Sequence, residues 1–107
     1  MKITKKFLRE TVLPYLKKYP KRYRPGVFAV RNNVAVMDED MPKFDPAKPP
    51  PRGYKYDLEH LIIALHPDKE FHGDKAWNET YNFLTIIVRR CTPTYDETVR
   101  RLEEYVK

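Results

Sequence analysis

The sequence predicts an α+β domain, a small and mainly helical fold with four helices, one β-hairpin and a proline-rich extended arm. Three observations favour this class. Four stretches carry apolar residues at the i, i+3, i+4 spacing of a helix. Two short β-prone runs flank a pair of asparagines, and a proline-dense segment follows them. Helices combined with a local hairpin around one core define the α+β class.

Length and composition limit what the chain can do. It has 107 residues, of which 41% are hydrophobic and 13% aromatic, and a single cysteine. A chain of this length buries one small core, so we expect one domain over 1–107. A lone cysteine excludes an internal disulfide and favours an intracellular, reducing compartment: cytoplasm, organelle or, for a viral protein, host cytoplasm. Without a run of ~20 apolar residues or a secretory signal pattern, we expect a soluble protein.

The first predicted helix covers residues 4–19. Its apolar residues at helical spacing are Leu8, Val12, Tyr15, Leu16 and Tyr19. Thr4 is a suitable N-cap because its hydroxyl can accept from the first turn. Pro14 lacks a backbone donor and clashes with the preceding turn, which predicts a kink or a break near residues 12–13. Pro20 ends the helix.

A β-hairpin is predicted in the first half of the chain. Residues 27–31 and 34–37 are both β-prone, and Asn32 and Asn33 between them tolerate the positive φ angles of a tight turn. Residues 42–53 then hold five prolines and a glycine, which exclude a helix interior or a sheet ladder. We therefore expect an extended, polyproline-like surface arm there.

Two further helices are predicted on either side of a loop over residues 66–73. The first begins after the N-cap Asp57 and stops at Pro67, although a strand is the rival prediction for this stretch. Its apolar stripe is formed by Leu58, Leu61, Ile62 and Leu65. The second begins after the N-cap Asp74 and is expected to be the core helix. Its apolar face is formed by Trp77, Tyr81, Leu84, Ile87 or Val88, and Cys91.

The last predicted helix opens at Thr94. Thr94 with Glu97 three residues later fits a capping box. Glu97 and Arg101 are four residues apart, so they form a helix-stabilising ion pair. The inward-facing residues are Val99, Leu102 and Val106.

Charge is distributed unevenly along the chain. Residues 1–31 hold ten Lys and Arg against Glu10 alone, a net charge of +9. Residues 32–107 have a net charge of −3. The cationic N-terminal third is therefore where we expect a partner to bind, and it would attract phosphate backbones, anionic lipid heads or an acidic protein face.

The best candidate binding segment is the basic strip, residues 17–31. Its candidate contact residues are Lys17, Lys18, Tyr19, Lys21, Arg22, Tyr23, Arg24 and Arg31. Closely spaced cations can follow a phosphate backbone, and tyrosine rings can stack on bases. The alternative is a solvated helix end whose tyrosines pack on the core.

These features predict a non-enzymatic interaction domain. We expect an accessory subunit, adaptor or small inhibitor that docks on a larger protein or ribonucleoprotein partner through residues 1–31 and the proline arm 42–53. The alternative is a non-specific nucleic-acid-binding module that uses the basic strip. No Ser-His-Asp or Cys-His set and no glycine-rich phosphate loop can be built, so we expect no catalytic residues and no cofactor.

We also expect no metal site. The candidate zinc ligands have no recognised spacing. They are His60, His66, His72 and Cys91. The carboxylate cluster Asp38-Glu39-Asp40 is better explained as an acidic turn than as a Mg²⁺ site, because further carboxylates and a positioned lysine are missing.

One short motif suggests a family. The string His66-Pro67-Asp68 lies between two predicted helices, and residues 54–90 resemble helix II, the HPD loop and helix III of J-domain co-chaperones. The resemblance implies that the three residues contact an Hsp70-type partner and stimulate its ATP hydrolysis. The order of elements along the chain also resembles E2-like and RWD domains, which implies a non-catalytic protein-interaction domain. The same three residues equally form a plain helix-stop turn.

Overall fold

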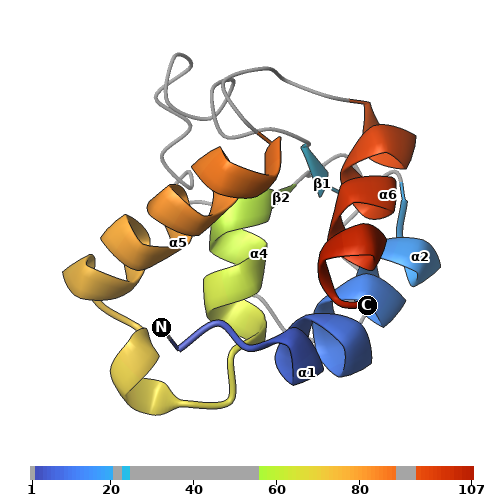
Figure 1. The fold of residues 1–107 in the computed structure, drawn as a ribbon. Helices are drawn as coiled ribbons and strands as arrows, with labels where there is room; N and C mark the ends of the chain where they lie inside the picture. Colours follow the sequence, from blue (N-terminus) through green and yellow to red (C-terminus); the bar gives the residue numbers. More distant parts are fainter. Residues whose placement is uncertain (1, 21–22, 25–55, 89–93) are drawn as a thin grey trace.

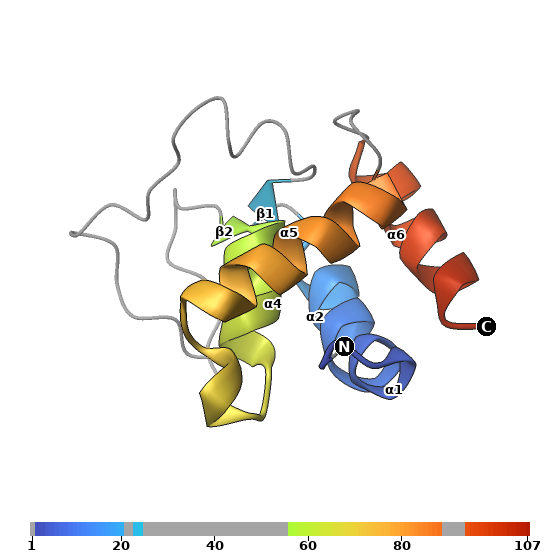
Figure 2. The same ribbon diagram turned by 60° about the vertical axis from the view of Figure 1, so that its left-hand side comes forward.

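The computed structural model of the chain describes residues 2–20, 23–24, 56–88 and 94–107. These residues form a helical domain (Figures 1 and 2). Helix α4 (Leu58–Leu65) packs against α5 (Asp74–Val88) and against the N-terminal helix. Helix α6 (Tyr95–Tyr105) packs against α5 and against the end of the N-terminal helix. The core therefore lies where four helical segments meet.

The N-terminal helix consists of α1 (Lys5–Phe7), the π-helical turn η1 (Leu8–Val12) and α2 (Leu13–Lys18). The Oγ1 of Thr4 accepts from the Phe7 amide at 3.1 Å, which confirms the predicted N-cap. The irregularity predicted near residues 12–13 is present, but it is not a break. The turn widens instead, and the Leu13 amide donates to the carbonyl of Leu8. A widened turn immediately before Pro14 accommodates a residue that cannot donate.

The remaining helices confirm three of the predicted segments with small changes at their ends. The stretch whose alternative was a strand is helical over Leu58–Leu65, and strand pairing covers only Tyr56–Asp57 ahead of it. Helix α5 begins at Asp74, and the Gly73 carbonyl accepts from the Ala76 and Trp77 amides, so the helix starts one residue earlier than predicted. Its predicted extension to Cys91 lies outside the described residues.

The buried face of α5 is rotated from the predicted one. Trp77 and Tyr81 are only partly buried. The fully buried positions of α5 are Ala76, Thr80, Phe83, Leu84 and Ile87. Small side chains such as those of Ala76 and Thr80 fit where packed helices lie close together. The rings of Trp77 and Tyr81 lie at the edge of the contact. The inward positions predicted for α6 are all buried: Val99, Leu102 and Val106.

The predicted α+β class is wrong. The described residues are helical and contain no β-hairpin. The strand pairing in these residues joins β1 (Tyr23–Arg24) to β2 (Tyr56–Asp57) in parallel, with Tyr23 opposite Tyr56. Two residues in each strand are too few to form an independent sheet. The packed helical faces supply the core without it.

Two other predicted segments lie outside the described residues. They are the runs 27–37, assigned above to a hairpin, and the proline arm 42–53. Among the helices that are described, none has the length and apolar character needed to span a membrane.

Candidate functional site

The basic strip is described at its beginning and along part of its backbone. Lys17 and Lys18 are exposed in the last turn of α2, and Tyr19 follows at the helix end. The backbone of Tyr23 and Arg24 forms β1. Lys21, Arg22 and Arg31 lie outside the described residues. The described part of the strip thus runs from the end of the N-terminal helix to β1, and β1 and β2 both pack against α4.

The first residues of the strip already have contacts within the domain. The Nζ of Lys17 lies 3.5 Å from Oε1 of Glu103 on α6. The Nζ of Lys18 lies 5.4 Å from the centre of the Tyr19 ring, within the range of a cation–π contact. Tyr19 is partly buried against the core, and its ring lies 5.0 Å from that of Tyr15. Of the two lysines, Lys18 therefore presents its charge to solvent more freely.

A charged groove of about 660 Å³ runs between the end of α2 and α6. Its basic lining residues are Lys17, Arg100 and Lys107, and its acidic ones are Asp96, Glu103 and Glu104. The two signs are balanced, so the groove has no net attraction for an anion.

The hydroxyl of Tyr95 fastens α6 to the N-terminal helix beside this groove. It donates to the carbonyl of Leu16 at 2.7 Å. Burial raises the pKa of the Tyr95 hydroxyl, and the carboxylates of Asp96 and Glu103 raise it further. The hydroxyl therefore stays protonated and keeps its role as a donor.

The His66-Pro67-Asp68 string forms the turn that follows α4. The Nε2 of His66 lies 2.9 Å from the carbonyl oxygen of Lys2, and its Nδ1 lies 3.1 Å from the amide nitrogen of Asp68. Because a carbonyl can only accept and an amide N–H can only donate, Nε2 carries the ring hydrogen and Nδ1 is the acceptor. Both ring nitrogens are therefore used inside the domain.

Aromatic rings enclose the same imidazole. The ring of Phe71 stacks on His66 with centroids 4.1 Å apart, and the ring of Phe7 meets it edge-on at 4.8 Å. His66 as a whole is 9% exposed. The Nε2 of His72 donates to the His66 carbonyl at 3.1 Å. This histidine is thus a packed member of the turn, joined to three separate segments of the chain.

Asp68 organises the next part of the turn. Its Oδ1 accepts from the Glu70 amide at 2.9 Å and caps the short 3₁₀ helix η2 (Lys69–Phe71). Its Oδ2 lies 3.4 Å from Nζ of Lys2, which also lies 3.9 Å from Glu70. The hydrogen bond from the Glu70 amide lowers the pKa of Asp68, and the Lys2 ammonium lowers it further.

This geometry gives the turn a sufficient structural explanation. His66 follows the last turn of α4, Pro67 cannot continue the helix, and Asp68 caps the next one. The string also lies between two packed helices, α4 and α5, which is the order on which the J-domain resemblance was based. Co-chaperone activity stays a prediction. The histidine to which the resemblance assigns partner contact, His66, is here enclosed by residues of the same chain.

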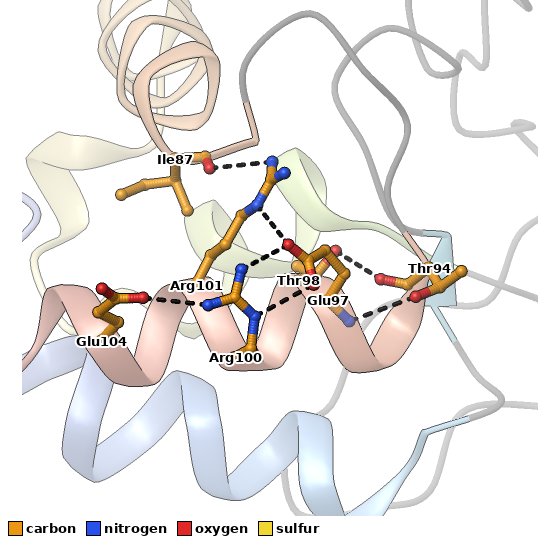
Figure 3. Close-up of polar contacts among 7 residues, drawn as sticks. All are labelled: Ile87, Thr94, Glu97, Thr98, Arg100, Arg101 and Glu104. Carbon is orange, nitrogen blue, oxygen red and sulfur yellow. Dashed lines mark hydrogen bonds and ion pairs between the residues drawn. The ribbon is translucent and has the colours of Figure 1, made fainter.

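A second polar cluster lies on α6 (Figure 3). Oε1 of Glu97 accepts from Arg100 at 2.6 Å and from Arg101 at 3.0 Å. Its Oε2 accepts a further bond from Arg100 at 3.1 Å. Hydrogen bonds from Arg100, and next those from Arg101, lower the pKa of Glu97 to about 2. The predicted Glu97–Arg101 pair is confirmed, and the sequence pattern missed Arg100.

The capping box predicted at the start of α6 is half formed. The Oγ1 of Thr94 accepts from the Glu97 amide at 3.3 Å, which confirms the N-cap. The Glu97 carboxylate faces the two arginines (Figure 3). Charged donors outcompete a neutral backbone amide for a carboxylate.

Arg101 links this cluster to the end of α5. Its Nη1 donates to the Ile87 carbonyl at 3.5 Å, which places a cation at the helix C-terminus (Figure 3). Ile86, the neighbouring residue, is 68% exposed and borders a hollow of about 460 Å³ between α5 and α6. Sequence reasoning missed this feature, since the predicted apolar face of the helix did not include Ile86 and no role was assigned to it.

Metal-ligating residues do not come together in the described part of the chain. No group of three or more His, Cys, Asp or Glu side chains is placed to hold an ion within 2–20, 23–24, 56–88 and 94–107. His66 and His72 are engaged in the turn, and the ring of His60 lies 4.4 Å from that of Trp77. Cys91 and the 38–40 cluster lie outside the described residues.

Comparisons of the chain with protein-family models, with curated proteins and with solved structures find no match.

Proposed function

We propose that this chain is a non-enzymatic interaction domain that docks on a larger protein or ribonucleoprotein partner through its cationic N-terminal third and its proline arm. The observation that carries the proposal is the anchoring of the basic strip at two points. Lys17 and Lys18 are held on the last turn of α2, and the backbone of Tyr23 and Arg24 is held by pairing with β2. A segment anchored in this way loses less conformational entropy when it binds.

Two cations of the N-terminal third have carboxylate partners within the domain. Lys17 is paired with Glu103, and further upstream Lys2 is paired with Asp68. Lys18 is exposed, and Lys21 and Arg22 follow it before β1 begins. We therefore assign docking to Lys18, Lys21 and Arg22, whose charges would meet an acidic surface and speed association with it.

The environment of Tyr19 favours a protein surface over nucleic acid as the partner. Stacking on a base needs an accessible ring face, whereas Tyr19 packs on the core, contacts Tyr15 and lies under the Lys18 ammonium. The charges remain suited to any anionic surface. Nucleic acid is therefore the outcome that the experiment must separate from an acidic protein.

The test is a tagged pull-down from the native host with and without nuclease, analysed by mass spectrometry. Two variants with the same loss of charge are compared: Lys21→Ala with Arg22→Ala in the strip, and Lys69→Ala with Lys75→Ala elsewhere. We expect a stoichiometric, nuclease-resistant partner that the strip variant loses and the control variant retains. Equal retention by both variants would exclude the strip as the docking site. Loss on nuclease treatment would show that nucleic acid is the ligand.

A further inference from the structure

We propose that His66 is a proton-sensitive clasp, which holds the N-terminal segment 2–4 against the turn between α4 and α5 and releases it when the imidazole is protonated. The clasp is the bond from Nε2 of His66 to the Lys2 carbonyl, 2.9 Å long, between residues that are 64 positions apart in the chain. It does not depend on the function proposed above.

The hydrogen-bonding pattern around the ring fits a single protonation state. Nε2 donates to Lys2 and Nδ1 accepts from the amide of Asp68. Protonation adds a hydrogen to Nδ1, at the point where the Asp68 N–H already directs its own. Two donors then face each other, so the ring or the turn has to move. Moving the ring also breaks the bond from Nε2 to the Lys2 carbonyl.

The surroundings of the ring give the charged form little solvation. Phe71 lies against one face and Phe7 against the edge, and the residue is nearly buried. A charged imidazolium enclosed by aromatic side chains loses hydration that the neutral ring does not need. Opening the clasp returns the charge to water, which favours the open state at low pH.

Charged and titratable groups from two segments lie around the turn that holds the ring. The N-terminal segment contributes Lys2, and the turn contributes Asp68, Glu70 and His72. The Asp68 carboxylate attracts an imidazolium, but it already accepts from the Glu70 amide and pairs with Lys2. The ammonium of Lys2 repels a charged ring. From α1, the uncharged Phe7 contacts the ring.

Opening would uncover apolar surface and free a cation. Ile3 is 3% exposed while the segment is closed, and Phe7 is buried beside it. Lys2 would leave Asp68 and Glu70, and its charge would add to the cationic surface of the N-terminal third. Acidification would therefore change both the apolar and the cationic surface at this end of the molecule.

The test is an NMR titration of the full chain, with the ring nitrogens of His66 and the amides of residues 2–4 observed together. The range runs from about pH 7.5 to about pH 5, because a free imidazole titrates near ~6.5. We expect the Nε2–H tautomer at the upper end. On protonation, the NOEs between the His66 and Phe7 rings should disappear while the resonances of α5 and α6 stay in place.

Four results would overturn the proposal, three of them in the titration of the ring itself. Those three are an Nδ1–H tautomer at neutral pH, a ring that stays neutral throughout the range, and a ring that protonates while residues 2–4 and the NOEs to Phe7 are unchanged. Unfolding of the whole chain with the ring would equally overturn it as a local device.

Two variants identify the titrating group. His72→Gln keeps an amide donor for the His66 carbonyl and should retain the transition, so its loss there would assign the effect to His72 and overturn the proposal. His66→Gln should abolish it. If that variant does not fold, the titration of the unmodified chain with His72→Gln decides the question.

Discussion

The N-terminal helix is fastened to the rest of the domain at both of its ends, and the two fastenings are chemically different. At its start, the segment before α1 is held by the ring of His66. At its far end, α2 is held by α6 through the Tyr95 hydroxyl on the Leu16 carbonyl and the ion pair between Lys17 and Glu103. One fastening is enclosed by aromatic rings, and the other lies beside an open, charged groove.

This difference determines which conditions act on each end. The ring of His66 is buried, so salt has little effect on its hydrogen bonds, although the exposed pair of Lys2 and Asp68 in the same turn is screened. The pair of Lys17 and Glu103 has both side chains about half exposed, at 56% and 47%, so salt screens it and its contribution is small. The two ends therefore differ in what holds them, a buried aromatic-enclosed ring at the start of the helix and a hydroxyl with an exposed ion pair at its far end.

The comparison also changes what the charge asymmetry means. The net charge of +9 over residues 1–31 predicts a surface for an external partner. Part of that charge is used within the domain: Lys2 on Asp68, Lys17 on Glu103, and Arg9, whose Nη1 donates to the Val106 carbonyl at 3.3 Å. The acidic and C-terminal parts of the chain are its internal partners. The surplus for an outside surface is therefore smaller than the sequence suggests.

The largest expected effect on stability comes from truncating a core side chain of the N-terminal helix. Leu16 lies on α2, its side chain has no exposed surface, and its carbonyl is the acceptor of the far fastening. Leu16→Ala leaves a cavity in the core and should lower the free energy of unfolding by about 2–5 kcal/mol, measured by urea denaturation. We expect both ends to loosen together.

The control for this variant is Ile86→Ala. Ile86 is the large apolar residue of α5 that stands 68% exposed, so its truncation should change stability by less than ~0.5 kcal/mol. Equal effects of the two substitutions would contradict the packing of the N-terminal helix described above.

The sequence predicts the helices well because their signals are local. The N-caps Thr4 and Thr94 and the inward face of α6 follow from spacings of three and four residues. The rotation of the α5 face could not be predicted, because Ala76 and Thr80 score as weak core residues. They are buried because neighbouring helices approach closely there, and that is a tertiary property.

In the candidate sites, too, only contacts between residues close in sequence could be predicted. The Glu97–Arg101 pair is four residues apart and was predictable, whereas the contact of His66 with Lys2 spans 64 residues and has no local signal. The α+β class failed for a related reason. Its hairpin was inferred from β-prone runs on either side of Asn32 and Asn33, while the described structure is built from helices.

The second largest expected effect on stability concerns only the fastening between α2 and α6. Tyr95→Phe removes the donor to the Leu16 carbonyl and leaves the ring in place. Loss of one partly buried hydrogen bond should cost about 1 kcal/mol in urea denaturation. We expect the environment of His66 to be unchanged, since this hydroxyl acts at the other end of the helix.

Tyr105→Phe is the matched control. Phenylalanine keeps the contact of this ring with Phe83, at 5.4 Å, and with the Lys5 ammonium. Its effect should be smaller than that of Tyr95→Phe. A shift of the His66 resonances in the Tyr95 variant would show instead that the two ends are coupled through the helix.

The smallest effect concerns the acid response of α6. The carboxyl of Glu97 has its pKa lowered to about 2 by hydrogen bonds from Arg100 and then Arg101, so it stabilises the fold above its ordinary value of 4.5. That stabilisation is lost as pH falls from 4.5 through about 2, because the carboxylate is protonated there. Glu97→Gln should therefore be less stable than the parent near neutral pH, and the difference should vanish toward about pH 2.

Glu104→Gln is the control, because Glu104 accepts a single bond from Arg100, at 3.2 Å, and its side chain is 70% exposed. Its stability difference from the parent should be smaller at every pH, and moderate salt should reduce both differences. A Glu97→Gln deficit that persists unchanged into acid would mean that the glutamate acts through packing rather than charge. In the expected case, the acid response of α6 follows from the loss of the negative charge of Glu97, whereas the response proposed for the His66 turn follows from the gain of a positive charge on the imidazole.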